Sequence, residues 1–159
     1  MSPARRATTD DIPAIVALIN VAYQIESFFV RDDRTDANEV RDLLIAGDFL
    51  VLDGEAGSPM AGCVFVEPRP DARAYLGLLS VQPGGQKRGT GRLLVEAAEA
   101  HARHLGARIM ELIMVDLREE LPAWYAKQGY TPAGEVPVPG NRTDRFTRPV
   151  RFLKMEKTL

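Results

Sequence analysis

The sequence has little of several residue types that mark specialised protein classes. It contains one cysteine and two histidines among 159 residues. A single cysteine cannot form an internal disulfide, and Cys63 lies in the apolar run 61–66, so we expect a small buried strand residue rather than a nucleophile. His101 and His104 stand three residues apart with no third candidate ligand nearby, and we therefore expect no metal site.

Long hydrophobic runs and an excess of one charge are also absent. The longest uninterrupted apolar stretches have about six residues, whereas a membrane-spanning helix needs about 20. The N-terminus is polar without a signal-like apolar region, so we expect a cytoplasmic protein. Lys and Arg total 20 against 22 Asp and Glu, for a net charge of -2, which disfavours a general nucleic-acid binder. We expect neither membrane nor nucleic acid among the partners.

Size and composition predict one folded domain. The chain is within the usual length of a single domain, and its 45% hydrophobic and 26% charged residues are close to the average for globular proteins. No repeat, charge block or linker-like stretch divides the sequence. We therefore expect residues 1–159 to form a single domain.

Hydrophobic periodicity predicts a mixed α/β architecture. Helical spacing favours helices that begin at residue 9 or cover 36–46, 89–105 and 121–128. Short apolar or alternating runs favour strands at 49–52, 60–66, 74–81, 109–115 and 150–155, with the third of these central. The first strands follow one another as hairpins and later ones are joined through a helix, so we infer a mixed sheet with helices on its faces.

The segment 81–94 combines a strand end, a glycine-rich turn and a helix start. Free backbone N–H groups at a helix N-terminus attract an anion, and glycines let it approach the backbone. Lys87, Arg88 and Arg92 add positive charge. The glycines follow neither the P-loop nor the Rossmann order, which disfavours ATP and NAD. The alternative to an anion site is that the segment is a well-capped turn that is exposed to solvent and binds no ligand.

Residues 86–91 resemble the acyl-CoA-binding signature Gln/Arg-x-x-Gly-x-Gly/Ala of the GNAT family of N-acetyltransferases. As in that family, a Val-x-Pro strand end at 81–83 precedes the signature and a leucine pair at 93–94 follows it. Residues 124–130 resemble the family's downstream aromatic-Tyr-x-x-x-Gly-Phe/Tyr pattern. The resemblance extends over essentially the whole chain. It implies an α/β (α+β) fold, with a mixed, mostly antiparallel sheet of six to seven strands flanked by about four helices.

The resemblance also implies an activity and a site. The activity is transfer of the acetyl group of acetyl-CoA, as cosubstrate, to a primary amine of a small molecule or peptide by direct attack in a ternary complex. The catalytic groups would be the Val81 amide facing the thioester oxygen and Tyr125 protonating the leaving thiolate. The residues implied in binding acetyl-CoA are Leu79, Val81, Gln86, Lys87, Arg88, Gly89, Thr90, Gly91 and Arg92.

Departures from the family pattern leave three points open. Where some relatives carry a catalytic glutamate this chain has Tyr75, so the general base is Glu111, Glu26, Glu67 or a bound water. Arg118 stands where the family often has the Asn that contacts the cofactor arm; it either supplies a replacement donor or faces solvent, and we expect the latter. Without an assured base, a non-catalytic acyl-CoA-binding sensor or interaction module is the alternative function.

The acceptor amine is not identified by the sequence. The loops 24–35 and 132–149 should line its pocket. Six acidic residues face three basic ones in the segment 26–42, and long-range attraction leads to the hypothesis of a cationic small amine or an amino terminus as acceptor. The basic tail 140–157 leaves a nucleotide phosphate or a second subunit, and hence a homodimer, as open partners.

Overall fold

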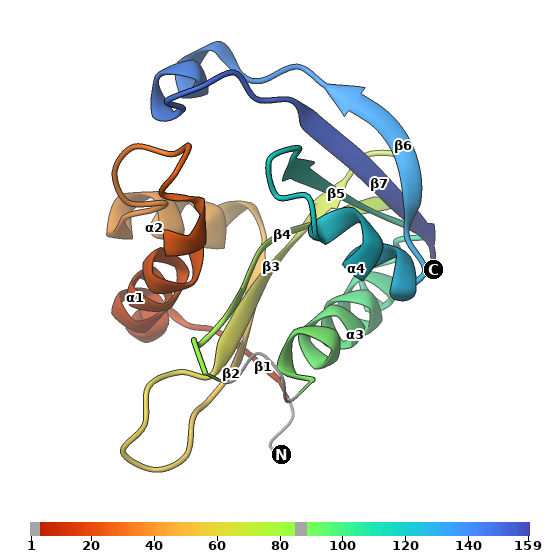
Figure 1. Cartoon of the computed structure of the whole chain (residues 1–159). Helices are drawn as coiled ribbons and strands as arrows, with labels where there is room; N and C mark the ends of the chain where they lie inside the picture. Colours follow the sequence, from red (N-terminus) through yellow and green to blue (C-terminus); the bar gives the residue numbers. More distant parts are fainter. Residues whose placement is uncertain (1–3, 85–88) are drawn as a thin grey trace.

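A computed structural model describes residues 4–84 and 89–159, and these build a seven-stranded sheet (Figure 1). The strand order is β1-β2-β3-β4-β5-β7-β6. Among the described strands, β4 and β5 pair in parallel and every other neighbouring pair is antiparallel. The predicted mixed, mostly antiparallel sheet is confirmed. The strands are β1 (Arg5–Arg6), β2 (Asp48–Leu52), β3 (Gly62–Arg69), β4 (Arg73–Val81), β5 (Ile109–Val115), β6 (Thr131–Val136) and β7 (Phe152–Thr158).

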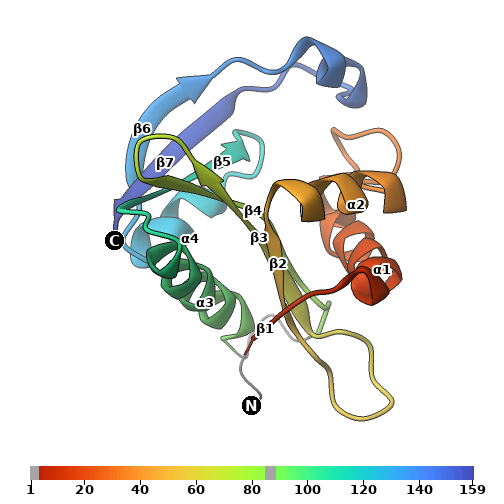
Figure 2. The same ribbon diagram turned by 180° about the vertical axis from the view of Figure 1, so that it is seen from behind.

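Four α-helices within the described residues cover the two faces of the sheet. Figures 1 and 2 show α1 and α2 on one face and α3 and α4 on the other. None of the described helices is both long enough and apolar enough to cross a membrane. The helices are α1 (Ile12–Ala22), α2 (Ala37–Ala46), α3 (Thr90–His104) and α4 (Leu121–Lys127), with short 3-10 turns η1 (Thr9–Asp11), η2 (Tyr23–Glu26) and η4 (Gly140–Arg145).

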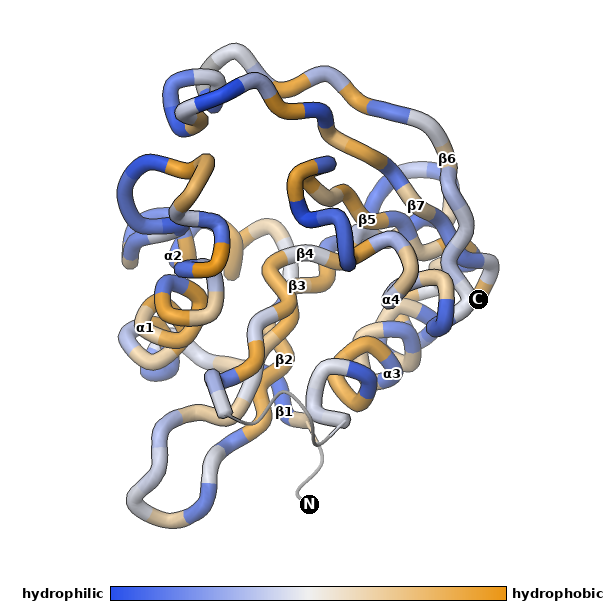
Figure 3. The backbone as a smooth tube through the Cα atoms, in the orientation of Figure 1, coloured by the Kyte–Doolittle hydropathy of each residue, from blue (hydrophilic) through white to orange (hydrophobic). Residues whose placement is uncertain are grey.

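Two hydrophobic clusters on opposite sides of the sheet hold the helices in place. Successive strand side chains point to opposite faces, so Phe49 and Cys63 pack with α1 whereas Leu50 and Val64 pack with α3. Covering both faces explains why β2 and β3 read as continuous apolar runs, which Figure 3 shows as the hydrophobic centre of the chain. Each fully buried aliphatic or aromatic side chain stabilises the fold by about 1.5–3 kcal/mol.

One strand falls in a segment that the sequence predicts as a loop. Residues 132–149 contain most of β6, followed by η4. β6 lies at the edge of the sheet, its residues 131–135 are exposed, and its register with β7 shifts between Pro132 and Glu135. Gly134 has a φ of 97°, which only glycine adopts without strain. An exposed edge strand with proline and glycine lacks the apolar alternation on which strand prediction depends.

The parallel pair β4 and β5 diverges soon after it begins. Registered partners run from Arg73 with Ile109 to Tyr75 with Glu111, and beyond them the two strands separate. β4 also contains a bulge, because its register with β3 shifts between Cys63 and Phe65 and Leu78 adopts a φ of 52°. The divergence and the bulge together open the sheet at its centre.

Candidate active site

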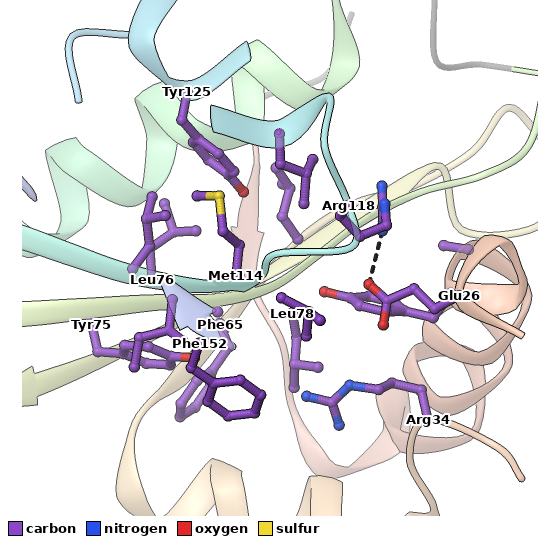
Figure 4. A pocket seen from close by; sticks show the side chains of 18 of the residues that line it. Glu26, Arg34, Phe65, Tyr75, Leu76, Leu78, Met114, Arg118, Tyr125 and Phe152 are labelled. Carbon is purple, nitrogen blue, oxygen red and sulfur yellow. Dashed lines mark hydrogen bonds and ion pairs between the residues drawn. The ribbon is translucent and has the colours of Figure 1, made fainter. Parts of the chain in front are cut away.

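A cavity of about 1050 Å³ occupies the opening between the diverging strands (Figure 4). Its wall comes from η2, α2, β3, β4, β5, α4, the start of α3 and residues 136–142. The loops 24–35 and 132–149, which the sequence predicts to line a pocket, both contribute to this wall. Of the predicted site residues, those in the wall are Leu79, Val81, Gly89, Gly91, Arg92 and Tyr125.

Thr90 lies beside this wall, and the side chain of Arg92 extends from it toward solvent. Thr90 is buried at the start of α3 and does not line the cavity. Arg92 is largely exposed and pairs with Glu96, at 3.1 Å between Arg92 Nε and Glu96 Oε1. Gln86, Lys87 and Arg88 lie outside the described residues.

The N-terminus of α3 opens onto the cavity through two glycines. Gly89 caps the helix with a φ of 76°, and its carbonyl accepts the first helical hydrogen bond, from the Leu93 amide at 3.0 Å. The amides of the helix's first residues therefore have no carbonyl within the helix. A Cβ on Gly91 would lie 3.2 Å from Trp124 Cζ2, so glycine allows α3 to approach α4 closely. The arrangement fits an anion bound by backbone amides at a helix start.

Beyond Tyr75, the edge of β4 that faces β5 has no strand partner among residues 4–84 and 89–159. The Gln82 amide donates to the Ala61 carbonyl at 2.9 Å, on the β3 side. Because successive N–H groups of a strand point to opposite edges, the Val81 N–H is directed toward the β5 side, where the cavity lies. An extended ligand chain could pair with this edge as an added strand does.

Tyr125 is a buried tyrosine whose hydroxyl is available to the cavity. Figure 4 shows its hydroxyl pointing inward near Met114, and this hydroxyl forms no hydrogen bond with the described part of the chain. Its ring packs edge-on against Trp124 and Tyr130, with ring centres 4.9 and 5.8 Å away. Burial raises the pKa of Tyr125 well above its ordinary value of 10.0, so the phenol keeps its proton at neutral pH.

Arg118 does not face solvent, and the prediction that it would do so was wrong. Its Nη1 donates to Glu26 Oε2 at 2.9 Å, and its Nε donates to the exposed Glu120 at 3.1 Å. Glu26 is almost fully buried, and a buried carboxylate requires a cation or hydrogen-bond donors nearby. Burial raises the pKa of Glu26, and the hydrogen bond from Arg118 opposes this rise. The pair joins η2 to the loop after β5 across the cavity wall (Figure 4).

The three carboxylates considered for a general base, and Tyr75, which replaces the family's glutamate, occupy different places in the structure. Glu26 and Glu67 line the cavity, the latter 3.4 Å from Arg69 Nη2. Tyr75 also lines it, with the Arg69 guanidinium 4.7 Å from its ring centre. Glu111 is not in the cavity wall and instead pairs with basic side chains of neighbouring strands, including Arg73 at 3.2 Å.

Two arginines in the wall were not singled out from the sequence. Arg34 Nη1 is buried without a hydrogen bond to any described residue, and the Arg34 guanidinium lies 5.5 Å from the centre of the Tyr23 ring. Arg142 lines the same cavity from η4, and burial, followed by the nearby Arg34, lowers its pKa. Both stand in irregular segments whose sequence shows no periodic pattern, so only their membership of pocket-lining loops could be predicted.

Cys63 and His101 lie away from the cavity wall. Cys63 is buried in β3 as predicted, and burial raises its pKa to about 12, so its thiol stays protonated. His101 Nε2 is 2.8 Å from Asp48 Oδ2. Within residues 4–84 and 89–159, no group of three or more His, Cys, Asp or Glu side chains is placed to hold a metal ion.

Comparison with known proteins agrees with this architecture. The model of the acetyltransferase (GNAT) family matches residues 14–130. An amino-acid acetyltransferase from Ralstonia nicotianae is 26% identical over 156 residues, which are 98% of this chain and 32% of that protein. The chain thus spans about a third of the length of this curated relative.

Solved structures with the same fold include two enzymes with informative names. Ribosomal-protein-alanine N-acetyltransferase from Brucella melitensis superposes with a TM-score of 0.78 at 22% identity and covers 99% of this chain and 100% of its own. N-acetylglutamate synthase from Neisseria gonorrhoeae, complexed with coenzyme A and N-acetyl-glutamate, superposes with a TM-score of 0.70 at 22% identity. The superposition covers 98% of this chain and 34% of the synthase chain. At these identities the likeness shows the fold, and the family model, which matches well over half of the sequence, shows that this chain belongs to the GNAT family of acetyltransferases.

Proposed function

We propose that this chain transfers the acetyl group of acetyl-CoA to a primary amine by direct attack in a ternary complex. One observation carries the proposal: the start of α3, the free edge of β4 and the Tyr125 hydroxyl meet at one cavity. The start of α3 suits the pyrophosphate of the donor, the β4 edge suits its extended arm and thioester, and the Tyr125 hydroxyl suits its leaving sulfur. The names of the amino-acid acetyltransferase and of the synthase complexed with coenzyme A support the same donor.

Binding of the donor is assigned to the first turn of α3 and to β4. The amides of Thr90, Gly91 and Arg92 would hold the pyrophosphate, since they precede the first helical hydrogen bond and carry the positive end of the helix dipole. Lys87 and Arg88, together with Gln86, belong to the same proposed anion site by sequence. Bound there, acetyl-CoA supplies the activated acetyl group.

Two groups are assigned to the chemical step. The Val81 N–H donates toward the thioester oxygen, where negative charge grows as the amine attacks, and a preorganised donor stabilises that charge more than it stabilises the ground state. As the carbon–sulfur bond breaks, the Tyr125 hydroxyl gives its proton to the leaving thiolate. Tyr125 is protonated at neutral pH, because burial raises its pKa further above neutrality, and it can therefore act as the proton donor.

Removal of the proton from the incoming ammonium group is assigned to a carboxylate of the cavity wall, directly or through water. Glu26 and Glu67 line the cavity, whereas Glu111 does not, and this restricts the proposal to the first two. Burial raises the pKa of Glu26 toward the working range of a general base. A fall in the rate of Glu26→Gln, with its acid limb lost from the pH profile, would identify Glu26. A Glu26→Gln variant with the wild-type rate and pH profile would assign the role of general base to Glu67 or to a bound water.

The function is tested by release of free CoA from acetyl-CoA in the presence of a mixed panel of primary amines, followed with a thiol reagent. Cys63 is buried and should not contribute to the signal. We also expect acetyl-CoA, but not ATP or NAD, to raise the melting temperature, because a ligand of the native state stabilises it by mass action. Acetyl-CoA binding without turnover on any amine would favour a sensor. Equal shifts with all three nucleotides would contradict the acetyl-CoA site.

A further inference from the structure

The cavity wall contains a partly buried guanidinium group, that of Arg34, which has no hydrogen bond to a carboxylate of the described chain. Arg34 extends into the cavity from the loop before α2 (Figure 4). Its Nη1 atom is buried and makes no hydrogen bond within the described chain. The carboxylate oxygen that pairs with it, Glu39 Oε1, lies 3.6 Å from Arg34 Nη1, which is too far for a hydrogen bond. A buried charged donor without a hydrogen bond is costly, so this position suits an additional acceptor of hydrogen bonds.

Positive charge exceeds negative charge around this guanidinium. Arg142 lines the same part of the wall, and Arg145 Nη2 lies 3.6 Å from Glu39 Oε2. Thr35 also donates its hydroxyl to Glu39, at 2.6 Å. Arg34 and Arg145 thus share the Glu39 carboxylate, and Arg142 forms no ion pair with any residue that the structure describes. Burial, and then the charge of Arg34, lowers the pKa of Arg142, as crowded cations require.

The other acidic residues of the cavity do not neutralise these arginines. Glu26 and Glu120 pair with Arg118, and Glu67 pairs with a neighbouring arginine. Asp36 and Asp42 are exposed at the rim of the cavity. Of the acidic residues that the sequence suggested as attractors of a cationic amine, Glu26 and Glu39 line the cavity but are already paired with arginines, and Asp36 and Asp42 lie exposed at its rim.

Backbone hydrogen bonds close this side of the cavity. The Arg31 amide donates to the Arg145 carbonyl at 2.7 Å, the Thr147 amide donates to the Phe29 carbonyl at 2.9 Å, and Val30 forms a bridge with Phe146. Figure 1 shows the segment after β6 arching toward the loop before α2, where these contacts form. A joined wall leaves room for a small acceptor and obstructs an extended polypeptide.

From these contacts we infer that the acceptor carries a carboxylate beside its amine, as a free amino acid does, and that Arg34 and Arg142 bind this carboxylate. The inference rests on the acetyl transfer proposed above and names its substrate class. A planar guanidinium binds a carboxylate through two parallel hydrogen bonds, which would satisfy Arg34 Nη1 and balance the excess charge. The Tyr23 ring and the hydrogen bond from Arg145 Nη1 to the Arg34 carbonyl, at 3.2 Å, hold the segment in position.

The test compares free amino acids with their carboxamides and with the corresponding decarboxylated amines, at saturating acetyl-CoA and with rates corrected for the fraction of neutral amine. We expect kcat/KM for the best amino acid to exceed that of its carboxamide by about 10- to 100-fold, the usual effect of losing hydrogen bonds to a charged group. Equal values for acid and carboxamide would overturn the inference. Turnover of decarboxylated amines alone would also overturn it, while leaving acetyl transfer established.

Variants locate the effect. Arg34→Met and Arg142→Met should each raise KM for the amino acid about 10-fold or more and abolish the preference over the carboxamide, with KM for acetyl-CoA unchanged. The control Arg41→Met removes an exposed arginine of α2 outside the cavity and should keep the preference. Retention of the preference in both cavity variants would refute the assignment to these arginines.

A second readout does not depend on turnover. The preferred amino acid should raise the melting temperature of the wild type and of Arg41→Met, but not that of Arg34→Met. Because Arg34 Nη1 lacks a hydrogen bond, Arg34→Met itself should melt no lower than the wild type. An amino acid that stabilises the protein but is not acetylated would support the carboxylate-binding site and contradict the proposed acetyl transfer. If no amino acid stabilises the protein and none is acetylated, the inference fails.

Discussion

Replacement of Arg118 by methionine should leave Glu26 buried without its cation. The two side chains are 17% and 9% exposed, and their ion pair measures 2.9 Å. Loss of one partner of a buried pair commonly costs about 3–5 kcal/mol. Protonation of Glu26 limits this cost, because the neutral carboxyl group needs no cation. The free energy of protonating it rises by about 1.4 kcal/mol for each pH unit above its ordinary pKa of 4.5. We therefore expect Arg118→Met to lose about 3 kcal/mol of unfolding free energy at pH 7 and less than about 1 kcal/mol at pH 5.

The sign follows from proton binding. In the variant, the folded chain holds the Glu26 proton to higher pH than the unfolded chain does, so stability decreases as pH rises from about 4.5. Urea unfolding at pH 5 and pH 7, followed by the fluorescence of the single tryptophan, Trp124, measures the unfolding free energy of the variant and of the wild type. The double variant Glu26→Gln/Arg118→Met should recover most of the loss. As a control, Arg92→Met removes an exposed pair worth about 0.5 kcal/mol. Equal losses at pH 5 and pH 7, or no loss at either, would refute the reasoning.

Three further predictions concern other parts of the molecule. Tyr125→Phe should lower turnover about 100-fold with little change in unfolding free energy, because the hydroxyl has no hydrogen bond to the described residues; wild-type turnover would assign the proton to another group. Gly89→Glu should abolish the melting-temperature rise caused by acetyl-CoA, whereas Gly89→Asn, which tolerates the φ of 76°, should retain it; a rise in the Glu variant would contradict the anion site. Hydrogen bonds from Arg5 lower the pKa of Asp11, so the stability difference between wild type and Arg5→Gln should exist above about pH 4 and disappear as pH falls below it; a difference independent of pH would exclude this linkage.

The parts of the fold that the sequence predicts are those with strong local signals. α1 and α3 bury residues at helical spacing, and the central strands are apolar on both faces, so periodicity was sufficient to locate them. β6 carries no such signal, since it is an exposed edge strand with Pro132 and Gly134. Its partner β7 supplies the hydrogen bonds that make it a strand, and that pairing is not visible in its own sequence.

Prediction of the site divides in the same way. The turn before α3 and the aromatic pair near Tyr125 are contiguous motifs, so the sequence alone was enough to propose them. The pair of Glu26 with Arg118 joins residues 92 positions apart, and the sequence does not show that folding buries both. Arg34 and Arg142 are likewise brought together only by the contact of two irregular segments. Charge counting along the chain therefore emphasised the acidic residues and missed the two partly buried arginines of the cavity wall.

The most direct test of the central claim is a crystal structure of this chain with CoA. The account predicts that the pyrophosphate lies against the amides of Thr90, Gly91 and Arg92, and that the pantetheine arm runs along the β4 edge near Val81 with its sulfur close to the Tyr125 hydroxyl. CoA bound elsewhere, with the opening between β4 and β5 filled by protein, would contradict the account.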